Sequence, residues 1–203
     1  MGKHQPDYFL MDKRQFMGAA LAAAAPLAIA APSARFTRGV GPALLTVSGA
    51  IARANRGALD PARDVMMHKQ KVVFSKARTF DFPQLLALPA VTIHPTLEYD
   101  AKVHAMRGPL LLEVLTAAGA RLDERTQLVL RAVDGYAATL TVAQARAQRF
   151  IVATHMDGQA MALGGLGPLW AIPDADRVPE LAARALTERF GGCPWSLYHI
   201  DVA

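Results

Sequence analysis

Residues 127–140 have the sequence QLVLRAVDGYAATL, which is the clearest structural signal in the chain. Two runs rich in β-branched and other apolar residues, 127–133 and 136–140, flank the dipeptide Asp134-Gly135. An Asp-Gly pair between two such runs favours a tight turn that joins antiparallel strands. The segment therefore predicts a β-hairpin.

A second hairpin is expected around Asp157-Gly158, between apolar runs at 150–154 and 159–163. Short apolar runs bounded by Gly, Pro or Ser predict further strands. These lie at residues 44–47, 71–74, 90–94, 169–172 and 195–202.

Several short helices are expected between the strands. Asp81 is a good N-cap for a helix over 82–88, because its carboxylate can accept hydrogen bonds from free backbone N–H groups. Pro109 suits the first turn of a helix over 109–118, which carries a leucine stripe at helical spacing. Helices are also expected over 141–148 and 179–190. Strands and helices do not alternate as βαβ units, so the fold class is α+β with a mixed sheet.

The N-terminal thirty residues have the features of an export signal. An uncharged, alanine-rich run covers 16–31, and 28–30 form a small-x-small cleavage pattern. Lys13-Arg14 before the run resembles a twin-arginine signal with Lys for the first Arg. An ordinary secretory signal and an uncleaved anchor are the alternatives. The expected organisation is a signal peptide over 1–30, a linker over 31–43 and one domain over 44–203, located in the periplasm.

Composition excludes several classes of protein. Of 203 residues, 52% are hydrophobic and 19% charged, which fits a folded domain with a core. Cys193 is the single cysteine, so disulfide scaffolds and cysteine-rich zinc sites are excluded. One long apolar run excludes a polytopic membrane protein, and no integral membrane domain is expected after signal removal. The formal net charge is +5, but the basic residues are scattered, so no nucleic-acid partner is expected.

Catalytic and metal-binding motifs are weak. His94, His104 and His155 offer imidazoles for a Ser/His/Asp triad, but no Gly-x-Ser-x-Gly elbow accompanies them. They also lack the His-x-x-x-His spacing that places two metal ligands on one helix face. Cys193 is expected to be a packed thiol rather than a reactive one.

The order of segments resembles the molybdopterin-binding oxidoreductase domain of the sulfite oxidase-like superfamily. The resemblance runs from about residue 44 to 202, and it rests on order and spacing rather than on one diagnostic motif. The segments that carry it are 44–49, 80–89, 107–115, 117–120, 134–136, 155–161, 164–170 and 200–202.

The resemblance implies a mixed, barrel-like α+β fold with a cleft for the molybdenum cofactor. Active members of the family bind the metal through a cysteine thiolate. The corresponding stretch, 91–99, contains no cysteine, and Cys193 does not match the position. Short exported members of the family commonly lack this ligand as well. By position near the matching segments, the cleft is expected to be lined by His94, Thr96, Arg107, Tyr136 and His155.

Three functional interpretations remain open at this point. The first is an exported oxidoreductase that holds molybdopterin by noncovalent contacts and acts on a small-molecule substrate with a periplasmic redox partner. The second is a cofactor-free binding module on the same fold that recognises a small anion or a protein partner. The third is a structural domain with a vestigial cleft.

Overall fold

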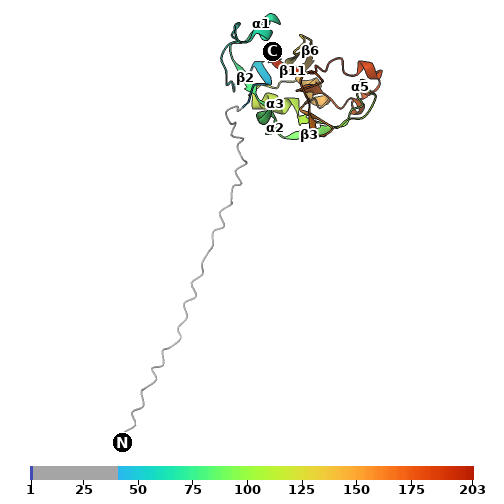
Figure 1. Cartoon of the computed structure of the whole chain (residues 1–203), viewed down its shortest axis with the longest axis horizontal. Helices are drawn as coiled ribbons and strands as arrows, with labels where there is room; N and C mark the ends of the chain where they lie inside the picture. The colour runs from blue at the N-terminus through green and yellow to red at the C-terminus, as the bar shows by residue number, and fades with distance from the viewer. Residues whose placement is uncertain (2–40) are drawn as a thin grey trace. The chain divides into compact units, whose positions relative to one another are not determined.

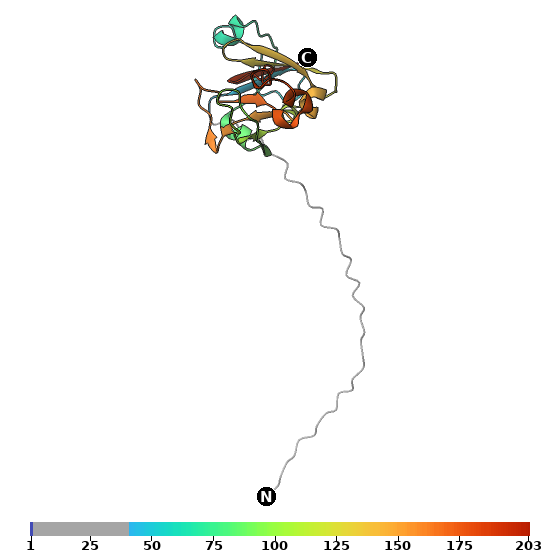
Figure 2. The same cartoon turned by 90° about the vertical axis from the view of Figure 1, so that its right-hand side faces the viewer.

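The computed structural model describes Met1 and residues 41–203. The predicted signal peptide and most of the predicted linker lie outside these residues. Figures 1 and 2 show the described domain as small sheets with short helices around them. The helices are α1 (Val65–Lys69), α2 (Phe82–Leu86), α3 (Leu111–Ala117), α4 (Val142–Ala147) and α5 (Pro179–Ala182), with 3-10 turns η1 (Ala175–Arg177) and η2 (Leu186–Glu188).

The largest sheet has five strands in the order β2-β1-β11-β5-β6. Its central strand β11 pairs in parallel with β1 and antiparallel with β5. The strands are β1 (Leu45–Gly49), β2 (Ala77–Phe80), β5 (Gln127–Ala132), β6 (Ala137–Thr141) and β11 (Leu197–Val202).

Two smaller sheets complete the domain. An antiparallel sheet has the order β3-β4-β8-β9, and β10 pairs with β7 in the other. The α+β class is therefore confirmed, whereas the described strands form open sheets rather than a closed barrel. The strands are β3 (Ala90–Ile93), β4 (Met106–Pro109), β7 (Ile151–Ala153), β8 (His155–Met156), β9 (Gln159–Ala160) and β10 (Trp170–Ile172).

The locally encoded predictions are confirmed. β5 and β6 form the expected hairpin, with Gly135 at φ 95° in the turn. β8 and β9 form a hairpin at the second expected turn, where Asp157 and Gly158 have positive φ. Its first strand is β8, however, and not the expected run 150–154, because β7 pairs with β10. Asp81 caps α2 by accepting from the backbone N–H of Gln84, whose side chain accepts from the Asp81 N–H in return.

Four boundaries differ from the expectation. Residues 71–74 form no strand; Val72 and Phe74 are buried side chains of an irregular segment. Pro109 ends β4 instead of starting a helix, because β4 pairs through it with β3. The expected helix over 179–190 is divided into α5 and η2. The strand expected over 159–163 is only β9, because the chain leaves the sheet after the hairpin.

The hydrophobic core connects all three sheets. Leu45 of β1, Leu115 of α3, Ile151 of β7 and Trp170 of β10 belong to one cluster and are fully buried. Burial of each such side chain contributes roughly 1.5–3 kcal/mol to stability. A smaller cluster, built from Val72, Phe74 and Ala77, lies apart from this one.

Gly108 lets two sheets approach each other closely. An added Cβ at Gly108 would lie 1.9 Å from the backbone oxygen of Val152 in β7. The contact continues at Thr154, whose backbone N–H donates to the Arg107 oxygen over 2.8 Å. Only a residue without a Cβ fits at this position of β4.

A buried polar network links β1 to β11. The Ser48 hydroxyl donates to Asp201 Oδ1 over 2.7 Å, and its oxygen lies 2.9 Å from His199 Nε2. Because the serine proton points to the carboxylate, the imidazole must donate from Nε2. His199 Nδ1 is then an acceptor, buried and without a hydrogen-bond partner. Ser48 and His199 are almost inaccessible to solvent, so the group is structural rather than a catalytic triad.

We predict that Gly108→Ala destabilises the domain by about 3 kcal/mol or more, because its methyl group would overlap backbone that cannot rotate away. Gly57→Ala is the matched control, since a Cβ there meets nothing within 4 Å. The control should change stability by less than about 1 kcal/mol. Urea unfolding followed by tryptophan fluorescence measures both variants. Equal effects would contradict the proposed contact.

We predict a loss of stability on acidification that depends on His199. Burial lowers the pKa of His199 from 6.5 to about 4, although Asp201 opposes the shift and Arg131 adds to it. Between these pH values the unfolded chain binds a proton that the folded chain does not. The contribution of His199 to the free energy of unfolding is therefore complete above about pH 6.5, and about 3 kcal/mol of it is lost as the pH drops to 4.

The variant His199→Gln isolates this contribution, because its amide can still donate to Ser48 but does not titrate. The measurement is the urea midpoint from pH 7 to pH 4 for both proteins. A wild-type slope no steeper than that of the variant would rule out His199 as the cause.

Candidate functional site

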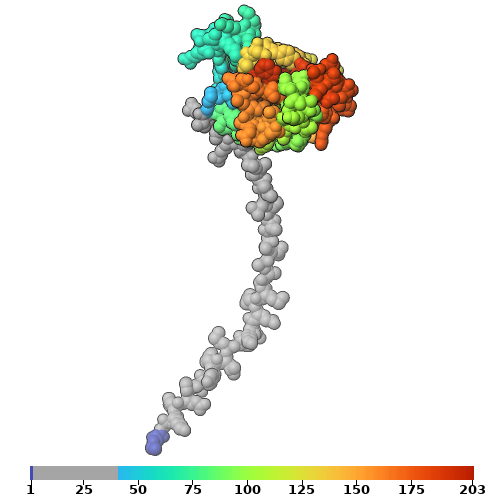
Figure 3. Space-filling view, turned by 45° about the vertical axis from the view of Figure 1, so that its right-hand side comes forward, coloured from blue at the N-terminus to red at the C-terminus, as the bar shows by residue number. Residues whose placement is uncertain are grey.

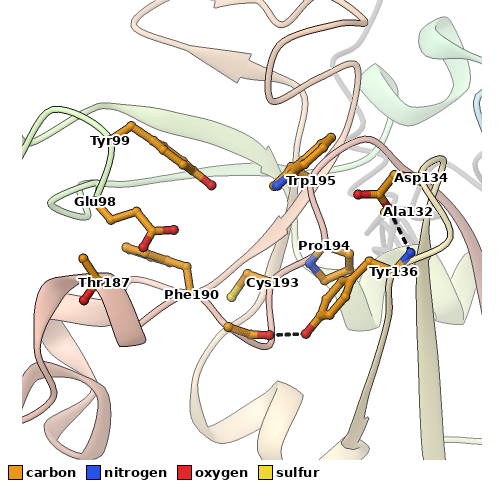
Figure 4. A pocket seen from close by; sticks show the side chains of 11 residues that line it. Glu98, Tyr99, Ala132, Asp134, Tyr136, Thr187, Phe190, Cys193, Pro194 and Trp195 are labelled. Atoms are coloured by element: carbon orange, nitrogen blue, oxygen red, sulfur yellow. Dashed lines mark hydrogen bonds between the residues drawn. The ribbon is translucent and has the colours of Figure 1, made fainter.

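A cavity of about 370 Å³ opens where three segments distant in sequence meet. Glu98 and Tyr99 come from the loop after β3, Asp134 and Tyr136 from the β5–β6 turn, and Trp195 from the segment that enters β11. Figure 4 shows the first pair on one side and the second pair on the other, with Cys193 and Pro194 between them. This volume is in the range of small-molecule sites.

Trp170 in β10 supports the cavity from the core. It is fully buried, and its indole N–H donates to the Cys193 oxygen over 2.9 Å. Its ring also packs against Tyr99 and Phe190, with centroid distances of 6.5 and 5.9 Å. The Trp170 side chain thus contacts the cavity walls at Tyr99 and Phe190 and the cavity floor at Cys193.

The β5–β6 turn supplies the opposite wall. Asp134 Oδ1 accepts the Tyr136 backbone N–H over 2.8 Å, an Asx turn that fixes the local backbone. The Tyr136 hydroxyl donates to the backbone oxygen of Gly191. The hairpin is therefore tied to the 190–195 segment across the cavity (Figure 4).

The loop after β3 is anchored by polar contacts at both ends. Asp176 accepts from both the backbone N–H and the hydroxyl of Thr96 at 2.7 Å, and it pairs with Arg189 at 2.6 Å. Figure 3 shows the resulting contact, with the surface around residue 100 in green against the red-orange surface of the C-terminal helical segment. Near the other end of the loop, His104 Nδ1 lies 2.6 Å from the carboxylate of Asp157. Hydrogen bonding to Asp157 raises the pKa of His104.

The cavity is acidic and rich in aromatic surface. Tyr99, Tyr136 and Trp195 are 57%, 47% and 38% exposed, and they are the most exposed aromatic side chains of residues 41–203. Two carboxylates, those of Glu98 and Asp134, belong to the lining, whereas no Lys, Arg or His of the described residues does.

Burial raises the pKa of the Cys193 thiol far above its usual range, and the Glu98 carboxylate adds to this shift. The pKa of Tyr99 is also raised, by partial burial and by Glu98. Glu98, Tyr99 and Cys193 all line this cavity. Cys193 is therefore a protonated, buried thiol, in agreement with the expected packed cysteine.

The five residues expected to share a cleft lie in four places. Tyr136 lines the cavity, and Thr96 serves as the loop anchor. Arg107 and His155 are paired neighbours on β4 and β8, within a row across the four-stranded sheet. The His155 Nδ1 atom lies 2.8 Å from the Thr154 hydroxyl.

His94 lines a second cavity, of about 310 Å³, at the end of β3. Arg149, Asp174 and Arg177 are among its other lining residues. Asp174 is largely buried there, and its Oδ1 has no hydrogen-bond partner. The second cavity thus has cationic groups but also an unsatisfied acceptor oxygen.

Sequence analysis missed most of the cavity, including Glu98, Tyr99 and Trp195. Two signals were present in the chain. Trp195 follows Gly-Gly-Cys-Pro, and Tyr136 follows the Asp-Gly turn, so both aromatic residues occupy turns where side chains stay exposed. Neither signal indicates that residues 98, 136 and 195 meet.

Comparison with known proteins supports the fold alone. The sequence matches no protein-family model and no curated protein. The structure is similar to the sulfane dehydrogenase SoxCD from Paracoccus pantotrophus, with a TM-score of 0.50 and 11% sequence identity. The match covers 78% of this chain and 37% of that chain. The architecture is thus distantly similar to that of a redox enzyme and consistent with a sulfite oxidase-like fold.

The residues of the larger cavity do not fit a molybdenum cofactor. The thiol of Cys193 is buried and held protonated, so it is a poor metal ligand. Within residues 41–203, no group of three or more His, Cys, Asp or Glu side chains is arranged to hold a metal. The lining carboxylates of the larger cavity would repel the phosphate of a pterin cofactor. We therefore derive no redox step at this site.

We predict that Cys193 does not react with a thiol reagent in the folded protein at pH 8, and that it reacts fully in urea. Burial and the neighbouring carboxylate both suppress the thiolate that such reagents need. A colorimetric disulfide reagent, applied with and without denaturant, measures the difference. Rapid labelling of the native protein would contradict the assigned environment.

Proposed function

We propose that this chain is an exported, cofactor-free binding module that holds a small molecule in the cavity beside Trp170. The observation that carries the proposal is the combination of a formed cavity, exposed aromatic walls and no available thiolate. Exposed aromatic side chains gathered in one concave site are typical of ligand recognition. The fold similarity to a dehydrogenase is compatible with this function, since one fold hosts many activities.

The alternative is the exported molybdopterin-dependent oxidoreductase that the segment order suggests. The distant structural similarity to a sulfane dehydrogenase supports it at the level of fold. In that case the row of Arg107 and His155 on the sheet would be the side chains able to contact an anionic cofactor. The acidic cavity and the buried cysteine favour the binding module.

Molybdenum and pterin analysis separates the two proposals. The full chain is expressed in a host that makes the cofactor, alongside a known molybdopterin enzyme as a positive control. We expect molybdenum far below one atom per chain and no pterin fluorescence after denaturation. Near-stoichiometric molybdenum with pterin would overturn the binding-module proposal, and Cys193→Ser would then show whether the thiol holds the metal.

Export is proposed from the first thirty residues of the sequence, and the described residues contain no helix able to cross a membrane. The same preparation tests export. Recovery from the periplasmic fraction with an N-terminus at Ala31 is expected. Protein that stays in the cytoplasm with Met1 intact would contradict this part of the proposal.

A further inference from the structure

We infer that the cavity beside Trp170 binds an organic cation of the quaternary ammonium class. The inference rests on the proposed binding function and names the ligand chemistry of the same site. It follows from the walls, the charge and the shape of the cavity.

The walls provide π-faces. Tyr99, Tyr136 and Trp195 come from three different segments, yet all three line one cavity (Figure 4). Aromatic faces attract cations through the ring quadrupole, and Trp and Tyr do so most strongly. Exposure of these rings to solvent is unfavourable for the free protein, so their convergence is best explained by a ligand that covers them.

The charge of the lining has one sign. Glu98 makes no ion pair with a Lys, Arg or His within residues 41–203, and Asp134 uses one oxygen for the Tyr136 N–H. No cationic side chain of the described part of the chain enters the lining. A bound anion would face two carboxylates, whereas a bound cation would neutralise them.

The interior favours a weakly hydrated cation over a metal ion. Aromatic rings and Pro194 occupy much of the lining, and the cavity volume of about 370 Å³ is far larger than a single ion needs. Two carboxylates on opposite walls do not form a coordination cage, which takes six or more oxygens for calcium. A trimethylammonium group is bulky and positive, and it cannot donate hydrogen bonds, so these walls suit it.

The test uses choline and its uncharged carbon isostere, 3,3-dimethyl-1-butanol, which has the same shape without the charge. Isothermal titration calorimetry on the full chain should show choline binding at least about tenfold more tightly than the isostere. Glu98→Gln should weaken choline binding by about tenfold, and Trp195→Leu by a similar factor. Glu113→Gln is the matched control, because Glu113 is an exposed residue of α3 outside the cavity. The affinity of this variant for choline should equal that of the wild type.

Each outcome decides the inference. Equal or tighter binding of the isostere would show that shape rather than charge is recognised, and it would overturn the cation assignment. Absence of choline binding in a protein free of molybdenum would overturn the ligand class and leave the binding module standing. Stoichiometric molybdenum would instead overturn the proposed function itself. Circular dichroism of both cavity variants is the check that they are folded.

Discussion

The parallel pairing of β1 with β11 is the contact on which the rest of the structure depends. It joins the first strand of the described domain to the last one, so the central sheet depends on a contact between strands far apart in the sequence. Gly49 permits the approach at one end, where a Cβ would lie 2.1 Å from the Val202 oxygen. The Ser48 hydroxyl of β1 forms hydrogen bonds with the side chains of His199 and Asp201 in β11. These two contacts cross between the paired strands and accompany the register in which Ser48 lies opposite Asp201.

The register of β11 determines the cavity, because the floor is the segment that leads into this strand. Cys193, Pro194 and Trp195 precede β11 directly, and Trp195 forms a bridge with Trp170 of β10. The position of Trp170 is in turn set by the pairing of β10 with β7. A displacement of β11 by one residue would exchange the two faces of the strand, both of which are largely buried, and move the floor away from the β5–β6 turn. The site is thus a consequence of pairing between distant strands and not of a local motif.

This dependence explains which features could be predicted from the sequence. The Asp134-Gly135 hairpin and the Asp81 cap use contacts within a few residues, so their side-chain chemistry encodes them. The local pattern at Pro109 predicts a helix, but pairing with Ala90 places it in a strand. The segment order indicated the fold correctly at a coarse level, as the similarity to a sulfane dehydrogenase shows. The proposed cleft grouped His94 and Arg107 with Tyr136, because sequence order does not reveal which sheet face a residue occupies.

The charge of the whole chain and the charge of the cavity have opposite signs, and distance determines which one a ligand experiences. The net charge of +5 is spread over scattered side chains, and salt screens exposed charges beyond about 8–10 Å. Glu98 and Asp134 lie in the lining itself, in direct reach of a bound group. At about 4 Å and an effective dielectric constant near 20, one carboxylate attracts a cation by roughly 4 kcal/mol before desolvation is subtracted. The local field therefore exceeds the distant one, and a protein with a basic overall charge can present a cavity selective for cations.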